Sequence, residues 1–124
     1  MSDKQVVLIV DDTADVILII NKLLKGKYKT KVAKNGEKAL QIALSDSPPD
    51  LILLDVMMPG MDGYEVCQRL QEDEQGRQIP VVFLTGNQSA EERERGLGLG
   101  AVDYISKPVE PAVLFACVVR VLES

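Results

Sequence analysis

Polar residues that could take part in chemistry stand where four apolar runs of this 124-residue chain end. Apolar runs of this length between helical patterns indicate buried strands of a parallel sheet. The carboxyl ends of parallel strands lie at one edge, which is where such sheets bind ligands. We therefore expect these side chains to lie close together. They are Asp11 and Asp12 after Val6–Val10, Asp55 after Leu51–Leu54, Thr85 after Pro80–Leu84, and Lys107 after Val102–Ile105.

A cluster of Asp11, Asp12 and Asp55 predicts a site for a hard divalent cation. Three carboxylates repel one another unless a cation lies among them, and oxygen ligands without His or Cys select Mg²⁺ or a similar ion. Mg²⁺ together with the Lys107 ammonium and the Thr85 hydroxyl suits a phosphoryl group, whose charge and oxygens they would satisfy. A carboxylate in such a site can act as nucleophile and form an aspartyl phosphate.

Each of these residues also has a simpler interpretation. Asp11 and Asp12 are typical helix N-cap residues, and Asp55 precedes a Pro-Gly turn in which Asp is common. Thr85 could simply end a strand, and Lys107 could be an ordinary surface charge. Turn residues that arise independently need not all lie at the same end of one sheet. Because all of these residues are expected to do so, a functional site is favoured.

Five strands alternate with five helices along the chain. The remaining strand, Lys29–Ala33, alternates polar and apolar residues as an edge strand does. Helical patterns follow each strand, and Ser89-Ala90-Glu91-Glu92 is a capping box that predicts a helix start. We expect the α/β class: a single doubly wound, flavodoxin-like, five-stranded parallel sheet in the order 2-1-3-4-5, with five helices. Residues 1–124 would form one domain.

Composition narrows the class of protein. The formal net charge is −5, which argues against broad binding to nucleic acid or to anionic membranes. The longest apolar run, Val16–Ile20, is too short to span a membrane, and the first residues do not resemble a signal peptide. We therefore expect a cytoplasmic protein in which Cys67 and Cys117 are buried free thiols.

The absence of histidine excludes several kinds of chemistry. Ser-His-Asp and Cys-His catalysis both need an imidazole, and so do most zinc sites. This chain also cannot itself carry a phosphohistidine.

Four segments together resemble the receiver (response-regulator) domain of two-component signal transduction, of the CheY-like type. They are Asp11-Asp12, the run Asp50–Gly63, Thr85-Gly86, and the run Gly100–Pro108. The resemblance extends over essentially the whole chain. It implies a phosphoacceptor domain that catalyses only its own phosphorylation and dephosphorylation.

The resemblance also implies roles for individual residues. Asp55 would accept a phosphoryl group from a phosphohistidine of a sensor histidine kinase or a phosphotransfer protein. Asp12, Asp55 and the backbone carbonyl of Met57 would bind Mg²⁺ directly, and Asp11 would bind it through water. Lys107 would pair with the phosphoryl group.

The switch implied by the resemblance lies beside this site. Thr85 would move toward phosphorylated Asp55, and Tyr104 would turn inward with it, although the simpler interpretation of Tyr104 is a strand aromatic half-packed on the surface. The Lys107-Pro108 peptide would be cis. The fourth helix, fifth strand and fifth helix would then present the face that binds a downstream partner or output domain.

Two further features come from this sequence itself. Gly96, Gly98 and Gly100 interrupt the end of the fourth helix, and glycine inside a helix costs about 1 kcal/mol relative to alanine. We therefore predict that residues 95–100 are locally weak and move on activation. Met57 and Asn87 would flank the path of an attacking water, where Met57 cannot orient water and would slow hydrolysis.

Alternative functions remain open at this stage. One is a phosphorylation-silent, receiver-like interaction module. Another is a phosphatase of the haloacid-dehalogenase type, which would want an Asp-x-Asp pair on one strand and a longer chain for a substrate cap. The chain is either a stand-alone regulator or a piece of a longer protein.

Overall fold

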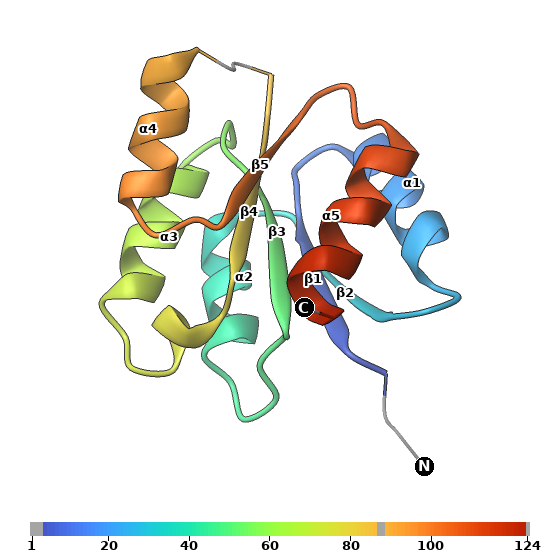
Figure 1. Cartoon of the computed structure of the whole chain (residues 1–124). Helices are drawn as coiled ribbons and strands as arrows, with labels where there is room; N and C mark the ends of the chain where they lie inside the picture. The colour runs from blue at the N-terminus through green and yellow to red at the C-terminus, as the bar shows by residue number, and fades with distance from the viewer. Residues whose placement is uncertain (1–3, 87–88, 124) are drawn as a thin grey trace.

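A five-stranded parallel sheet forms the centre of the molecule (Figure 1). The computed structural model describes residues 4–86 and 89–123. The strand order is β2-β1-β3-β4-β5 and all neighbours pair in parallel, which confirms the predicted sheet. The strands are β1 (Val6–Val10), β2 (Lys29–Ala33), β3 (Leu51–Asp55), β4 (Val81–Thr85) and β5 (Asp103–Ser106).

Helices cover both faces of this sheet. In Figure 1, α1 and α5 lie on one side, and α2, α3 and α4 lie on the other. A 3-10 turn lies between α3 and β4, and its Gly76 is buried because it packs against Leu70. The helices are α1 (Ala14–Leu24), α2 (Gly36–Ala43), α3 (Gly63–Gln71), α4 (Ala90–Gly98) and α5 (Pro111–Glu123), with the 3-10 turn η1 at Gly76–Gln78.

Two hydrophobic cores result, one on each face of the sheet. Successive side chains of a strand point to opposite faces, so Val7 and Ile9 join the core under α1 and α5. Leu8 and Val10 join the core under α2 and α3. β3 is buried along its whole length because it lies in the centre of the sheet. The mainly half-exposed β2 is an edge strand, as its alternation predicted.

Polar caps define where the helices begin. Asn35 Oδ1 accepts a hydrogen bond from Lys38 N (2.8 Å) at the start of α2, and Asp62 Oδ1 accepts one from Glu65 N (2.9 Å) at α3. Ser89 Oγ accepts from Glu92 N (3.2 Å), so the predicted capping box does begin α4. Each such cap stabilises a helix by about 1 kcal/mol.

Two of the three glycines near the end of α4 have a specific structural role. Gly100 has φ +102° and ends the helix, because Gly100 N donates to Leu97 O (3.0 Å) and Ala101 N donates to Gly96 O (3.2 Å). This pair of bonds is the Schellman motif, which favours glycine. Gly96 faces the core, where a Cβ atom would lie 2.0 Å from the Tyr104 hydroxyl. The predicted movement of residues 95–100 stays a prediction.

Both cysteines, Cys67 and Cys117, are buried and free, as expected. Burial raises the pKa of each thiol to about 11, and for Cys117 the neighbouring Asp103 adds to this. Among residues 4–86 and 89–123, no helix has both the length and the apolar character needed to cross a membrane.

Candidate functional site

The aspartates predicted from the strand ends do come together. One carboxylate oxygen from each of Asp11, Asp12 and Asp55 lies within 4.8 Å of the other two. This follows from the sheet, because β1 and β3 are neighbours in register, with Val10 beside Leu54. Asp11 and Asp55 are almost fully buried, whereas Asp12 is exposed. The cluster is thus rooted in the sheet edge and opens toward solvent at Asp12.

Lys107 lies against two of these carboxylates. Its Nζ is 2.9 Å from Asp11 Oδ2 and 3.0 Å from Asp55 Oδ1. Within the described residues the buried Asp11 Oδ2 accepts no hydrogen bond of good geometry, so this ion pair is what compensates its charge. The Lys107–Pro108 peptide bond is cis. β5 therefore delivers an ammonium group to the point where β1 and β3 deliver carboxylates.

Backbone amides hold the two buried carboxylates in place. Thr13 N donates to Asp11 Oδ1 (2.9 Å), and Met57 N donates to Asp55 Oδ1 (3.3 Å). The loop after β3 is also fixed, because Gly63 N donates to Val56 O (2.9 Å) and a Cβ atom on Gly63 would lie 2.3 Å from the carbonyl oxygen of Asp55. Only glycine allows α3 to begin this close to the Asp55 backbone.

The surroundings of Asp55 move its pKa toward neutral pH. Burial raises the pKa of Asp55 to about 6, and the negative charge of Asp11 adds to the rise, while the bond with Lys107 opposes it. Burial alone would lower the pKa of Lys107, but its hydrogen bonds with Asp11 and Asp55 outweigh that effect and raise it. At neutral pH three carboxylates thus face one ammonium group, an excess of negative charge that favours a bound cation.

The donor set fits a magnesium ion. All the charged donors are carboxylate oxygens, which hard cations prefer. Mg²⁺ keeps several of its waters when it binds to proteins, and the exposed position of Asp12 leaves room for them. The predicted contribution of the Met57 carbonyl stays a prediction; the Met57 side chain is 76% exposed.

Thr85 and Tyr104 lie next to the carboxylate cluster. Thr85 ends β4 and is buried, in register with Ser106. Tyr104 points inward with 7% of its surface exposed, so the simpler interpretation of a half-packed surface aromatic is wrong. Its hydroxyl donates to the Glu92 carbonyl of α4, and its ring centroid lies 5.6 Å from that of Phe83. Asn87 lies outside the described residues.

Sequence reasoning missed a second tyrosine beside the site. Tyr64 follows Gly63 on α3, is 5% exposed, and donates its hydroxyl to the Glu92 carboxylate. With Thr85, Met57 and Glu92 it lines a cavity of about 140 Å³ between the Asp55 loop and α4. The sequence held no signal for this contact, because the two partners are 28 residues apart and an aromatic in a helix is most simply a core residue.

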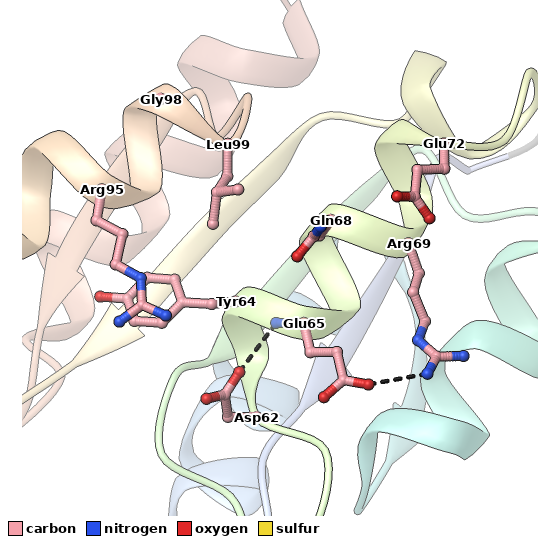
Figure 2. A pocket seen from close by; sticks show the side chains of 9 residues that line it. All are labelled: Asp62, Tyr64, Glu65, Gln68, Arg69, Glu72, Arg95, Gly98 and Leu99. Atoms are coloured by element: carbon pink, nitrogen blue, oxygen red, sulfur yellow. Dashed lines mark hydrogen bonds and ion pairs between the residues drawn. The ribbon is translucent and has the colours of Figure 1, made fainter.

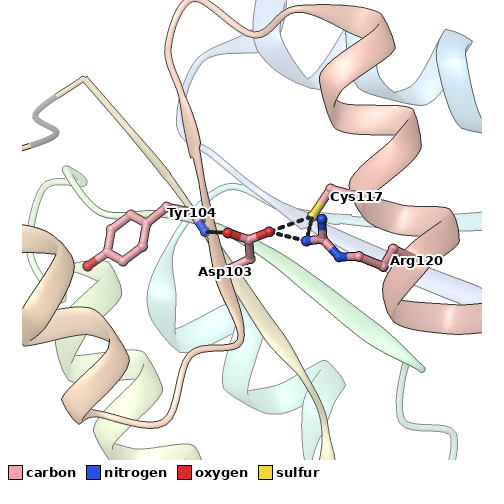
Figure 3. A network of polar contacts seen from close by, with 4 residues as sticks. All are labelled: Asp103, Tyr104, Cys117 and Arg120. Carbon is pink, nitrogen blue, oxygen red and sulfur yellow. Dashed lines mark hydrogen bonds and ion pairs between the residues drawn. The ribbon is translucent and has the colours of Figure 1, made fainter. Parts of the chain in front are cut away.

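Two further features lie outside the aspartate cluster. A groove of about 640 Å³ runs between α3 and α4, and Figure 2 shows the Arg95 guanidinium stacked over the Tyr64 ring at one end of it. Asp103 at the start of β5 pairs with Arg120 of α5, and the Cys117 thiol lies against the same carboxylate (Figure 3). This second cluster joins β5 to α5 and lies away from the aspartates.

Comparison with known proteins identifies the family. Residues 7–119 match the family model described as the response regulator receiver domain. The chain belongs to the response-regulator receiver family. Receivers are the phosphoacceptor signalling modules of two-component systems, so the predicted fold and general function are confirmed.

The relatives place this domain in different proteins. It is 46% identical over 111 residues to the response regulator PleD of Caulobacter vibrioides, covering 89% of this chain and 24% of PleD. It is 42% identical over 106 residues to histidine kinase P4 of Formosa agariphila, covering 86% of this chain and 8% of the kinase. The crystallised chemotaxis protein CheY4 of Vibrio cholerae superposes with a TM-score of 0.90 at 30% identity, over 97% of this chain and all of that one. The receiver therefore spans about a quarter of PleD but the whole of CheY4.

Proposed function

We propose that Asp55 is the phosphoacceptor of this receiver. The observation that carries the proposal is the Lys107 ammonium, which contacts both Asp55 and Asp11 at a buried sheet edge. A lysine in this position neutralises charge on a phosphoryl group attached to Asp55 and keeps that group at the edge of the sheet. Thr85 lies at the end of the neighbouring strand, where its hydroxyl can donate to a phosphoryl oxygen.

The transfer is a substitution at phosphorus. A carboxylate oxygen of Asp55 forms the new P–O bond while the P–N bond to the donor imidazole breaks, and that imidazole nitrogen takes a proton. Because the chain has no histidine, the phosphohistidine belongs to another chain or to another part of a longer protein. A sensor histidine kinase or a phosphotransfer protein is therefore the proposed donor.

We infer that Asp12 and Asp55, with the Met57 carbonyl, hold Mg²⁺ directly and that Asp11 holds it through water. The support is the carboxylate cluster, its excess negative charge and the exposed side at Asp12. When bound, Mg²⁺ offsets negative charge on the phosphoryl oxygens. Lys107 and the Thr85 hydroxyl complete the set of groups around them.

The proposed output face consists of α4, β5 and α5. A groove of about 470 Å³ lies there, between Arg93 of α4 and Val113 of α5, with Tyr104 and Pro108 in its lining. Val113, which the helical pattern would have placed inward, is 51% exposed. An apolar side chain beside a groove can contact a partner protein. Phosphorylation would alter this face through Thr85. Tyr104 already points inward in this structure, so the expected inward turn is not needed for its part in the switch.

The direct test is phosphorylation with acetyl phosphate and Mg²⁺, followed by intact mass. We expect one phosphoryl adduct that requires Mg²⁺, is labile in base and is absent from Asp55→Ala. Asp46→Ala is the matched control, because Asp46 is an exposed aspartate in the loop before β3, whereas Asp55 is at the other end of that strand. If wild-type protein neither forms the adduct nor binds beryllofluoride, the phosphorylation-silent interaction module becomes the better account. Family membership and the lone aspartate on β3 give no support to the haloacid-dehalogenase alternative.

A further inference from the structure

Tyr64 connects the phosphoacceptor loop to α4. Its backbone follows Gly63, which packs directly against the Asp55 carbonyl and bonds Val56 O at 2.9 Å. The Tyr64 side chain extends from α3 toward α4, and Figure 2 shows its ring against the Arg95 side chain. Tyr64 is therefore bonded directly to the residue that packs against the Asp55 backbone, and its own side chain contacts the helix of the proposed output face.

The contacts of the Tyr64 side chain are specific. The hydroxyl donates to the Glu92 carboxylate, and the Arg95 guanidinium lies 4.2 Å from the ring centroid. The ring also packs edge-on against Phe83, with centroids 5.2 Å apart. Burial and the bond to Glu92 raise the pKa of the Tyr64 phenol above its usual range, so it stays protonated and remains a donor at physiological pH.

Glu92 receives both tyrosine hydroxyls. Its carboxylate accepts from Tyr64 and its backbone carbonyl accepts from Tyr104. Phe83 lies between the two rings and touches each of them. The first turn of α4 is therefore held by two hydroxyl groups, one from a residue of α3 and one from a residue of β5.

α4 buries few of its own side chains among the residues that the structure describes. Gly96 is its one buried residue within the described structure, and Leu97 is 47% exposed. A helix normally gains most of its stability in a protein from packing an apolar face. The position of α4 thus depends on the tyrosine contacts more than on hydrophobic burial, so loss of one contact should shift or loosen the helix.

We propose that Tyr64 is a positioning residue that couples the phosphoacceptor site to α4 through Glu92. The inference rests on the proposed function of Asp55. It adds a second connection between Asp55 and the output face, beside the proposed one through Thr85 and Tyr104. Tyr64 and Glu92 line the same small cavity as Val56 and Met57, the two residues that follow Asp55, so a change in this loop on phosphorylation would reach the Tyr64–Glu92 bond. Because coupling is reciprocal, an α4 that is already held in place should favour binding at Asp55.

The test compares two conservative variants. Tyr64→Phe removes the hydroxyl and keeps the ring against Phe83 and Arg95. Tyr28→Phe is the matched control, because it also removes a tyrosine hydroxyl that donates to a glutamate, Glu123 (2.6 Å), but at the end of α5. Amide hydrogen exchange is measured in α4, and the affinity for beryllofluoride with Mg²⁺ is measured on the same proteins.

We expect Tyr64→Phe to speed amide exchange in α4 and to weaken beryllofluoride binding, each by roughly fivefold, as loss of one net hydrogen bond predicts. Tyr28→Phe should change neither. The effect of Tyr64→Phe should be non-additive with Tyr104→Phe, because both hydroxyls act on Glu92.

Three outcomes would overturn the inference. If wild type binds beryllofluoride and Tyr64→Phe binds it equally well, the coupling is absent while the proposed function stands. Faster exchange in α4 with an unchanged beryllofluoride affinity would show a merely structural bond. If wild type binds no beryllofluoride and forms no acetyl phosphate adduct, the proposed function fails and the coupling fails with it.

Discussion

Asp55 is a buried carboxylate whose ionisation the surrounding protein resists. Burial, together with the charge of Asp11, raises its pKa from 3.8 to about 6 in spite of Lys107. Its contribution to stability is therefore greatest below the unfolded value and is lost as pH rises through about 6. A shift of this size corresponds to at most about 3 kcal/mol of lost stability at neutral pH. The negative charge that Asp55 needs for its proposed role as phosphoacceptor is thus held at a cost to the stability of the fold.

We expect Asp55→Asn to be more stable than wild type at pH 7.5 by ~1–3 kcal/mol when Mg²⁺ is chelated. The advantage should shrink below pH 5, where Asp55 in wild type is itself protonated. Urea unfolding at both pH values checks this, with Asp46→Asn as the control for loss of an exposed charge. A difference that does not change with pH would contradict the assignment of the shift to Asp55.

Met57 is the second residue whose side chain should affect the chemistry proposed for Asp55. Met57 is 76% exposed, lies two residues after Asp55 and lines the cavity beside Thr85, so it is not part of the core. A thioether cannot orient a water for attack on an aspartyl phosphate, whereas an amide can. Met57→Asn should therefore shorten the lifetime of the phosphorylated protein several-fold. The lifetime is measured by intact mass after removal of acetyl phosphate, and an unchanged or longer lifetime would refute the idea.

At the scale of elements, the glycines of α4 serve different purposes. A Cβ atom on Gly96 would lie 2.0 Å from the Tyr104 hydroxyl and 2.9 Å from the Phe83 ring, but one on Gly98 would meet nothing within 4 Å. We expect Gly98→Ala to stabilise the protein by up to about 1 kcal/mol through helix propensity. Gly96→Ala should instead destabilise it by ~1–3 kcal/mol, because the methyl group overpacks the site of Tyr104.

Urea unfolding of the two alanine variants measures this difference. The cause is tested by repeating Gly96→Ala in a Tyr104→Ala background, where only the contact with Phe83 remains and the destabilisation should be smaller. If Gly96→Ala and Gly98→Ala had equal effects on stability in wild type, the inward position of Tyr104 would not depend on Gly96.

The elements also show how far sequence could predict this structure. Continuous apolar runs made the strands predictable, and the common end of parallel strands brought Asp11, Asp55 and Lys107 together as expected. Three strands end one residue later than expected, because Asp55, Thr85 and Ser106 are polar yet remain paired in the sheet. The 3-10 turn at Gly76 and the Tyr64–Glu92 bond could not be predicted, since both depend on packing between distant segments that leaves no periodic pattern.

At the scale of the whole molecule, strand order concentrates negative charge at one end of the sheet. The chain carries a net charge of −5, and the sheet places Asp11, Asp12 and Asp55 within one small volume against a single lysine. A bound divalent cation would relieve this repulsion in the folded protein, whereas in the unfolded chain Asp55 is 43 residues from Asp12 and free to move away from it. Mg²⁺ should therefore stabilise the fold as a whole.

The expected gain follows from mass action, about 1.4 kcal/mol when Mg²⁺ is at ten times its dissociation constant. It is measured as the rise in unfolding temperature with MgCl₂ against NaCl of equal ionic strength, which controls for general screening. Asp12→Asn should abolish most of the gain, and because Asp12 is exposed it should leave the stability without Mg²⁺ within about 0.5 kcal/mol of wild type. Asp46→Asn should keep the full gain. If Asp12→Asn gained as much from Mg²⁺ as wild type does, the ion would be acting elsewhere on the acidic surface, and the aspartate cluster would have to be explained by its pairing with Lys107 alone.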